Sequence, residues 1–387
     1  MANKNIPQIR FKGFDGEWRL LVLGAYSEIY RGGSPRPIDA YLTTSSNGIN
    51  WIKIGDVNKE SKYITTTQER IIEEGVINSR KVYSGDLILS NSMSFGRPYI
   101  LGINGCIHDG WLVIQNYHNI FDKEYLYYSL AIPSVLNQYK KMAAGSSVKN
   151  LNKDIVSEVV LPVPSSKCEQ TRIASLFTAI DKQISCSEAK LDKLRTIKKT
   201  LLKKMFASQG EKTPQIRFKG FEEEWEEKLL GEIGTINSGC DYKHLNRGNI
   251  PVYGTGGYMT SVDKALSYTK DAIGIGRKGT IDNPYILKAP FWTVDTLFYV
   301  FPKDNINLNF LFNLYCKVDW RSKNEASGVP SLSKGIINNV CIKTASLSEQ
   351  TRIASLFTAL DKQISCQEKK IEKLKAVKKT LLKKMFV

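Results

Sequence analysis

The chain has 387 residues, of which 42% are hydrophobic and 24% charged, a composition that excludes global disorder and allows sizeable cores. This length exceeds the size at which a single core usually keeps growing, so we expect two or more domains. Lysine and arginine outnumber aspartate and glutamate by 55 to 38, and the resulting net charge of +17 favours a polyanionic partner such as nucleic acid.

Targeting and cysteine patterns exclude further classes. The start MANKNIPQIRF has no apolar signal core, and no run approaches the ~20 apolar residues of a membrane span. None of the seven cysteines lies in a CxxC pair, so we expect neither a zinc site nor a disulfide framework. These patterns predict a cytoplasmic protein with no membrane partner.

The chain opens with a motif that it later repeats. PQIRFKGF stands at 7–14 and again at 214–221, each time followed by Glu-Trp and Leu-Gly at the same spacing. A longer motif at 169–206 recurs at 349–386 with 30 identities in 38 positions. The stretches between the motifs scarcely match. The chain is therefore a duplicated unit with a constant frame and divergent contents.

The first variable stretch, within a predicted domain over 1–165, has short apolar runs between turn signals. A helical pattern follows at 123–143, so we expect an α+β domain. Its loops RGGSPRPI (31–38) and SFGRPY (94–99) mix arginine with glycine, which lets a backbone approach another surface closely. The candidate nucleic-acid-contacting residues here are Arg31, Ser34, Arg36, Lys53, Arg97, Tyr99, Lys149 and Lys153.

The first copy of the long motif predicts an amphipathic helix within 166–208. Its apolar residues recur at steps of three and four, and no proline or glycine interrupts the run. A helix of about 38 residues at 1.5 Å per residue is roughly 57 Å long. The predicted seam residues are Ile173, Phe177, Ile180, Ile184, Leu191 and Leu194.

The second variable stretch, within 209–345, predicts another α+β domain. Its apolar runs lie at 249–259, 272–281, 283–301 and 307–318. The sequence GRKGT at 276–280 fits either an exposed hairpin turn or a binding loop, in which arginine contacts a guanine edge and lysine neutralises phosphate. The candidate contact residues are Tyr258, Arg277, Lys278, Thr280 and Lys334.

The second copy of the long motif, within 346–387, predicts a matching helix. A single rod would leave its apolar stripe in water, so we expect the two helices to pack on each other. An antiparallel coiled coil relates the two halves by a pseudo-two-fold axis and places the variable domains at opposite ends. The predicted seam residues of this copy are Ile353, Phe357, Leu360, Ile364, Ile371 and Leu374.

Both predicted helices end in a strongly basic half. Residues 190–204 contain seven lysines and arginines, and residues 369–384 contain eight lysines. Such a run fits a solvated face as well as it fits contact with phosphates or an acidic partner.

Catalytic motifs are incomplete throughout the chain. DNPY at 282–285 resembles the D/N/S-P-P-Y/F motif of amino-methyltransferases, but Asn283 replaces a proline and no FxGxG cofactor loop accompanies it. GTGGY at 254–258 lacks the GK[ST] of a phosphate-binding loop. The three histidines have neither metal-ligand spacing nor a nucleophile motif beside them. We therefore expect no catalytic residues and no metal site.

The ordered duplication resembles a type I restriction–modification specificity (S) subunit along essentially the whole chain. The resemblance rests on PQIRFKGFDGEW and PQIRFKGFEEEW opening the halves, on EQTRIASLFTAIDKQI closing each half with one substitution in the second copy, and on IGRKGTI. It implies two target-recognition domains, each reading one half of a split, asymmetric site in double-stranded DNA, and helices that act as a ruler between them.

The resemblance also implies partners and cofactors. Two methyltransferase (M) subunits would bring S-adenosylmethionine and adenine-N6 methylation, and two restriction (R) subunits would bring ATP, Mg²⁺ and DNA cleavage. This chain would then be non-catalytic and bind no cofactor. Two alternatives stay open: a self-contained DNA methyltransferase fused to a recognition domain, and a coiled-coil scaffold that never touches DNA.

Overall fold

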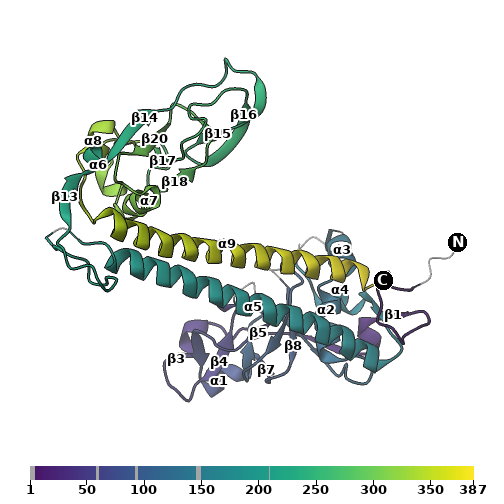
Figure 1. Ribbon diagram of the computed structural model, residues 1–387. Coiled ribbons are helices and arrows are strands. Elements are labelled where there is room, and N and C mark those ends of the chain that lie inside the picture. Colours follow the sequence, from purple (N-terminus) through teal and green to yellow (C-terminus); the bar gives the residue numbers. More distant parts are fainter. Residues whose placement is uncertain (1–4, 58–60, 92–94, 145–149, 209) are drawn as a thin grey trace. The chain divides into compact units, whose positions relative to one another are not determined.

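The computed structural model describes residues 5–57, 61–91, 95–144, 150–208 and 210–387 (Figure 1). The chain divides into two compact units, one of residues 1–186 with 371–387 and the other of residues 187–370. Each unit combines helices with sheets, so the predicted α+β class is confirmed. The predicted division set the helices apart as 166–208 and 346–387, whereas each compact unit takes in part of both helices.

The repeated long motif forms the two longest helices, α5 (Lys167–Lys204) and α9 (Leu347–Lys384) (Figure 1). In the second unit, Lys198 of α5 pairs with Asp361 of α9 at 2.5 Å, and Arg195 pairs with Glu368 at 2.7 Å. Residue numbers rise along one helix while they fall along the other, which confirms antiparallel packing. In the first unit Lys378 of α9 lies 2.6 Å from Asp181 of α5. These two residues hold the same motif positions as Lys198 and Asp361, so the same ion pair forms in each unit with the roles of the two helices exchanged.

Two five-stranded sheets build the variable part of the first unit. One has the order β2-β11-β8-β9-β5, and the other has the order β3-β6-β4-β10-β7. The strands of the first sheet are Glu28–Arg31, Trp111–Gln115, Leu87–Ser90, Pro98–Leu101 and Tyr63–Ile64. Those of the second are Leu42–Thr43, Glu69–Ile71, Ile49–Ile52, Gly105–Ile107 and Arg80–Val82.

Helices join these sheets to the frame of the first unit. β1 (Arg19–Val22) pairs antiparallel with β12 (Val160–Val163) just before α5. The predicted helix at 123–143 is two helices, because Pro133 begins a new one after a break at 131–132. The helices of this part are α1 (Glu73–Val76), α2 (Lys123–Leu130), α3 (Pro133–Ala144) and α4 (Lys153–Ser157).

The second unit repeats the frame and changes the contents. β13 (Glu226–Leu229) pairs with β21 (Cys341–Thr344), as β1 pairs with β12. A four-stranded sheet has the order β14-β20-β17-β18, with strands Gly234–Ser238, Leu297–Pro302, Ala272–Gly276 and Tyr285–Leu287. A three-stranded sheet has the order β16-β15-β19, with strands Gly257–Val262, Arg247–Gly254 and Trp292–Thr293.

The short helices of the second unit mirror those of the first. The apolar run at 307–318 forms α7 (Leu308–Lys317), the counterpart of α2. α8 (Lys334–Asn338) precedes β21 as α4 precedes β12, and α6 (Leu230–Ile233) follows β13. A 3₁₀ turn at Arg321–Lys323 lies in the loop between α7 and α8.

An aromatic cluster at the helix ends forms part of each core. In the second unit the Phe206 ring, just beyond α5, lies 6.1 Å from Trp225, 5.2 Å from Phe310 and 5.8 Å from Phe357. In the first unit Phe386, just beyond α9, lies 6.1 Å from the ring of Trp18 and also contacts Tyr125 and Phe177. The Met-Phe that closes each long motif is therefore a core element, which explains its presence in both copies.

An arginine–glutamate clasp joins the short motif to the long one. Arg10 donates to both carboxylate oxygens of Glu169 at 2.7 and 2.8 Å, and Arg217 donates to both oxygens of Glu349 at 2.8 Å. Both glutamates are 1% exposed. Such a bidentate pair is geometrically specific. The frame motifs are thus structural parts of one repeated socket rather than a catalytic signature.

Candidate nucleic-acid interface

Three of the predicted contact residues gather around Asp109 in the first unit. The Arg31 and Arg36 guanidinium groups each lie 4.0 Å from its carboxylate, and the Ser34 hydroxyl lies 3.0 Å from it. Both arginine side chains are mostly exposed. The loop at 31–36 therefore presents two cations to solvent beside a single acid.

The two glycines of this loop serve close packing inside the domain. A Cβ on Gly32 would lie 2.1 Å from the carbonyl oxygen of His108, and one on Gly33 would lie 2.7 Å from that of Asn78. The glycines of RGG were expected to let the backbone approach another surface closely, and in the structure that surface is the protein's own backbone. This close approach fixes the base of the loop that carries Arg31 and Arg36.

His108 anchors the same region from inside. Its Nε2 accepts a hydrogen bond from the backbone N–H of Ile54 at 3.1 Å. Burial lowers the pKa of His108 below its usual 6.5, and the neighbouring Asp109 carboxylate only partly opposes this effect. A neutral imidazole suits the acceptor role.

Tyr99 is wrong as a contact residue. Its side chain is 1% exposed and packs edge-on against Trp111 at 5.5 Å, because β9 lies inside its sheet with both faces covered. Arg97, next to this strand, is half-buried, and its guanidinium lies 5.5 Å from the Tyr99 ring centre. Lys53 is half-buried and paired with Glu69 at 2.6 Å.

Two further predicted lysines begin short helices, one in each unit. Lys153 is exposed at the start of α4, after Asn152, whose side chain caps the helix by accepting from the Ile155 N–H. Lys334 is exposed at the same point of α8, after the capping Ser333. Lys149 lies outside the described residues.

The predicted loop of the second unit rests on the segment before α8. The Gly279 N–H donates to the Pro330 carbonyl at 2.9 Å, and the Leu332 N–H donates to the Arg277 carbonyl at 2.9 Å. The charged groups of Arg277 and Lys334 both lie over the Phe298 ring, at 6.0 and 5.9 Å from its centre. The structure therefore brings two predicted residues together that are far apart in sequence.

The remaining predicted residues of this unit are accessible. Lys278 and Thr280 are exposed in the loop, and Gly279 between them has φ of +90°, a backbone conformation that favours glycine. Tyr258, exposed in the β15–β16 hairpin, has its hydroxyl 3.1 Å from Ser261.

The two units place different residues at one equivalent point. The Leu151 N–H donates to the carbonyl of Asn91 at 3.0 Å, as the Leu332 N–H donates to that of Arg277. Asn91 is buried and donates to the Asp109 carbonyl, whereas Arg277 is exposed. The same backbone scaffold thus carries unlike side chains.

A cleft of about 290 Å³ opens beside the 277–280 loop. Its lining residues are Gly279, Thr280, Ile281, Asp282, Arg321, Asn324 and Pro330. Arg321 donates through Nε to the Asp282 carboxylate, and this bond lowers the pKa of Asp282. Sequence reasoning missed Arg321 and Asn324. The available signal was two cations in the polar loop RSKNEASG.

The predicted seam residues lie mostly on the covered faces of the two helices. Ile180, Ile364 and Leu374 are half-buried, and the other nine are buried. Ile173 and Phe177 belong to the core of the first unit, and Ile353 and Phe357 to that of the second. These four residues therefore join helix to domain as well as helix to helix.

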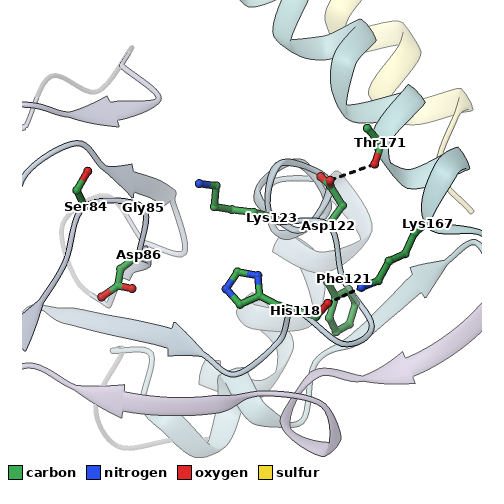
Figure 2. A pocket seen from close by; sticks show the side chains of 9 residues that line it. All are labelled: Ser84, Gly85, Asp86, His118, Phe121, Asp122, Lys123, Lys167 and Thr171. Carbon is green, nitrogen blue, oxygen red and sulfur yellow. Dashed lines mark hydrogen bonds between the residues drawn. The ribbon is translucent and has the colours of Figure 1, made fainter.

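A larger open pocket, of about 560 Å³, lies where α2 and α5 begin (Figure 2). Two contacts span it: Lys167 donates to the His118 carbonyl at 2.5 Å, and the Thr171 hydroxyl donates to Asp122 at 3.1 Å. Both contacts join α5 to residues 118–122, which precede α2. We assign this pocket to the junction between domain and helix.

The described residues also bear on metal binding and membrane insertion. Within the described ranges, no three His, Cys, Asp or Glu side chains are grouped as a metal site. In DNPY, Asp282 binds Arg321 and the Tyr285 hydroxyl donates to the Gly254 carbonyl at 2.5 Å. Among the same residues, no helix is long and apolar enough to cross a membrane.

Comparison with known proteins gives one consistent family. The family model described as "Type I restriction modification DNA specificity domain" matches residues 24–196 and 222–376. The MjaVIII specificity subunit of Methanocaldococcus jannaschii is 21% identical, over 95% of this chain and 91% of that protein. The EcoprrI specificity subunit of Escherichia coli is 20% identical, over 90% and 88%.

Solved structures share the fold. The type I restriction–modification S subunit from M. genitalium superposes with a TM-score of 0.69, at 17% identity and over 99% of both chains. A chain from a structural study of assembly and conformational transition in the type I system gives a TM-score of 0.56, at 16% identity, covering 95% of this chain and 97% of that one.

Proposed function

The chain belongs to the type I restriction–modification DNA specificity family, and from this premise we propose that its two units each read one half of a split, asymmetric site in double-stranded DNA. One observation carries the proposal: the contact that joins the frame motifs is the same in both units, whereas the side chains at an equivalent point of the variable domains differ. Arg10–Glu169 and Arg217–Glu349 repeat the same contact, whereas buried Asn91 and exposed Arg277 occupy one equivalent point.

Charge and exposure support DNA as the ligand. Arg31, Arg36, Lys153, Arg277 and Lys334 are exposed. Such cations supply the phosphate contacts that give affinity, while base edges supply specificity. We propose that α5 and α9, each about 57 Å long at 1.5 Å per residue, set the spacing of the two half-sites.

The long helices also support a proposal about partners. Thr171, Arg172, Ser175 and Lys182 are exposed on α5, and the same residue types are exposed at 351, 352, 355 and 362 of α9. The Thr171 hydroxyl donates to Asp122, and the guanidinium groups of Arg172 and Arg352 lie over the rings of Phe11 and Phe218, which explains part of this identity. The recurrence of serine at 175 and 355 and of lysine at 182 and 362 has no such contact with a domain among the described residues. We propose that each copy docks one of two identical methyltransferase subunits, and that two restriction subunits complete the complex.

The chemistry then belongs to those partners. We place S-adenosylmethionine on the methyltransferase subunits, and ATP and Mg²⁺ on the restriction subunits. The purified chain mixed with labelled S-adenosylmethionine and duplex DNA is expected to transfer no methyl group. Incorporation by the chain alone would favour a self-contained methyltransferase.

A domain exchange tests the reading function. Residues 234–332 would be replaced by the matching segment of another family member, which leaves Arg217, Trp225 and Glu349 in place. Methylated adenines would then be mapped in DNA treated with the complex of this chain and its methyltransferase partner. We expect one half of the site to change and the other to stay. A change in both halves, or in neither, contradicts the proposal.

A further inference from the structure

The cleft beside the 277–280 loop holds an arginine in a fixed orientation. Arg321 is 79% exposed at its side chain, yet its Nε is bonded to Asp282, which is only 33% exposed. The Asp282 carboxylate therefore holds one edge of the guanidinium against the protein. The Nη1 and Nη2 groups have no bonding partner among the residues that the structure describes.

The backbone under Arg321 is held firmly. The preceding Trp320 is 1% exposed and donates through its indole N–H to the Tyr315 carbonyl at 2.7 Å. Asn324, one turn later, accepts from the backbone N–H groups of Ala326 and Ser331 through its Oδ1. A buried ring on one side and a braced loop on the other limit how far Arg321 moves.

The chemistry of this arrangement suits one base. Two free N–H donors at the end of a guanidinium match the O6 and N7 acceptors of guanine in the major groove. A carboxylate on Nε leaves that end available and reduces the entropy lost on contact. Resting on the proposed function, we propose that Arg321, positioned by Asp282, reads a guanine in the half-site bound by the second unit.

Neighbouring cations fit a supporting role. Lys278 and Lys323 are exposed near the same cleft, and Arg277 and Lys334 lie over Phe298. Lysine acts as a point charge toward phosphate, and a phosphate contact carries no base code. Lys323, two residues from Arg321 in the same 3₁₀ turn, is therefore the matched control.

The test uses the full chain in complex with its methyltransferase partner. The methylated site of the wild-type complex is mapped first, and binding is then measured on duplexes carrying every base at each position. We expect Arg321→Ala to lower discrimination roughly 5- to 150-fold at one guanine of one half-site. Arg321→Lys keeps the charge without the fork, so it should retain affinity and weaken that preference. Asp282→Asn should weaken the same preference, and Lys323→Ala should weaken binding to all sequences alike.

The outcomes separate this inference from the proposed function. An unchanged site in Arg321→Ala, or an equal loss on every sequence, overturns the reading role while the bipartite site stands. If the wild-type complex recognises no specific site, or if both halves change with Arg321, the proposed function itself fails. Circular dichroism of each variant serves as the folding control, and we expect the wild-type spectrum in all of them.

Discussion

Arg217 and Glu349 lie 132 residues apart in the chain and are joined by two hydrogen bonds of 2.8 Å. The Trp225 indole adds a third bond to the same carboxylate at 3.1 Å. Arg10 and Glu169 form the equivalent pair, but the buried Trp18 indole nitrogen has no hydrogen-bond partner among the described residues. The second clasp therefore has one bond more than the first.

Removing one member of a clasp should destabilise its unit strongly. Arg217→Ala leaves the Glu349 carboxylate buried and unpaired, which typically costs about 3 to 5 kcal/mol of unfolding free energy. Hydrogen exchange of second-unit peptides measures the loss. Lys212→Ala breaks the exposed pair with Glu224 and should cost under about 1 kcal/mol. Equal effects of the two substitutions would show that the clasp adds little.

The phenylalanine just beyond each long helix should contribute as much to the free energy of unfolding as a central core residue does. Phe386→Ala removes a ring that contacts Trp18, Tyr125 and Phe177, and we expect a loss of about 3 to 5 kcal/mol from the first unit. Phe206→Ala should act likewise on the second unit. Denaturant unfolding followed by hydrogen exchange assigns each loss. A loss spread equally over both units would contradict this assignment.

Substitutions on the buried and the exposed faces of the helix pair should differ in their effect on stability. Leu360 is buried, so Leu360→Asp would place a carboxylate among apolar side chains and should cost at least the roughly 2 to 5 kcal/mol of deleting a buried leucine. Ile197 is 41% exposed on α5, so Ile197→Asp serves as the control and should cost much less. Thermal melts of the two variants make the comparison. Similar melting temperatures would mean that the Leu360 face is not packed.

The stability of the first unit should fall in mild acid. Since the folded-state pKa of His108 lies below 6.5, the unfolded chain takes up a proton first as pH falls through 6.5. The contribution from neutral His108 is therefore fully present above pH 6.5 and declines toward the lower, folded-state pKa. Unfolding free energy at pH 7.5, 6.5 and 5.5 should have a smaller slope in His108→Gln than in the wild type. An equal slope in the two proteins would show that His108 does not contribute to the pH dependence.

Arg277 should affect DNA binding in one of two distinguishable ways. It is exposed beside Lys334, so Arg277→Ala is expected to weaken binding. If Arg277 contacts a base, discrimination at one position falls by ~1–3 kcal/mol; if it contacts phosphate, affinity falls on all sequences and the salt dependence becomes shallower. Titrations at several salt concentrations separate these cases. Unchanged binding would remove Arg277 from the interface.

Periodic and repeated features were predictable from the sequence, and long-range contacts were not. Steps of three and four located α5 and α9, and the seam residues follow the buried face. The same pattern did not show that Phe177 and Phe357 also belong to domain cores. Tyr99 illustrates the limit for loops: an Arg-Pro-Tyr sequence looks like a surface turn, yet the strand that carries Tyr99 is buried on both faces.

Arg321 shows why the candidate site was incomplete. Its partner Asp282 lies 39 residues away and drew notice only as part of the incomplete DNPY motif, and Arg321 belongs to no recognisable motif. Only the folded chain brings them to one cleft with the predicted loop. In contrast, Arg277, in the GRKGT sequence, and Lys334 were both predicted as contact residues, without any sign that they share the Phe298 ring.

The repeated clasp has a consequence for the order of the domains. Glu169 and Glu349 begin nearly identical helices and receive their arginines in the same way. The arginine–glutamate bonds are alike in the two units, although Trp225 adds a bond in the second, so each socket should accept either domain. A chain with the two domains transposed would keep both clasps and recognise its half-sites in the reverse order along the DNA. The helices would then define positions, and the sequence read at each position would depend on which domain had been placed there.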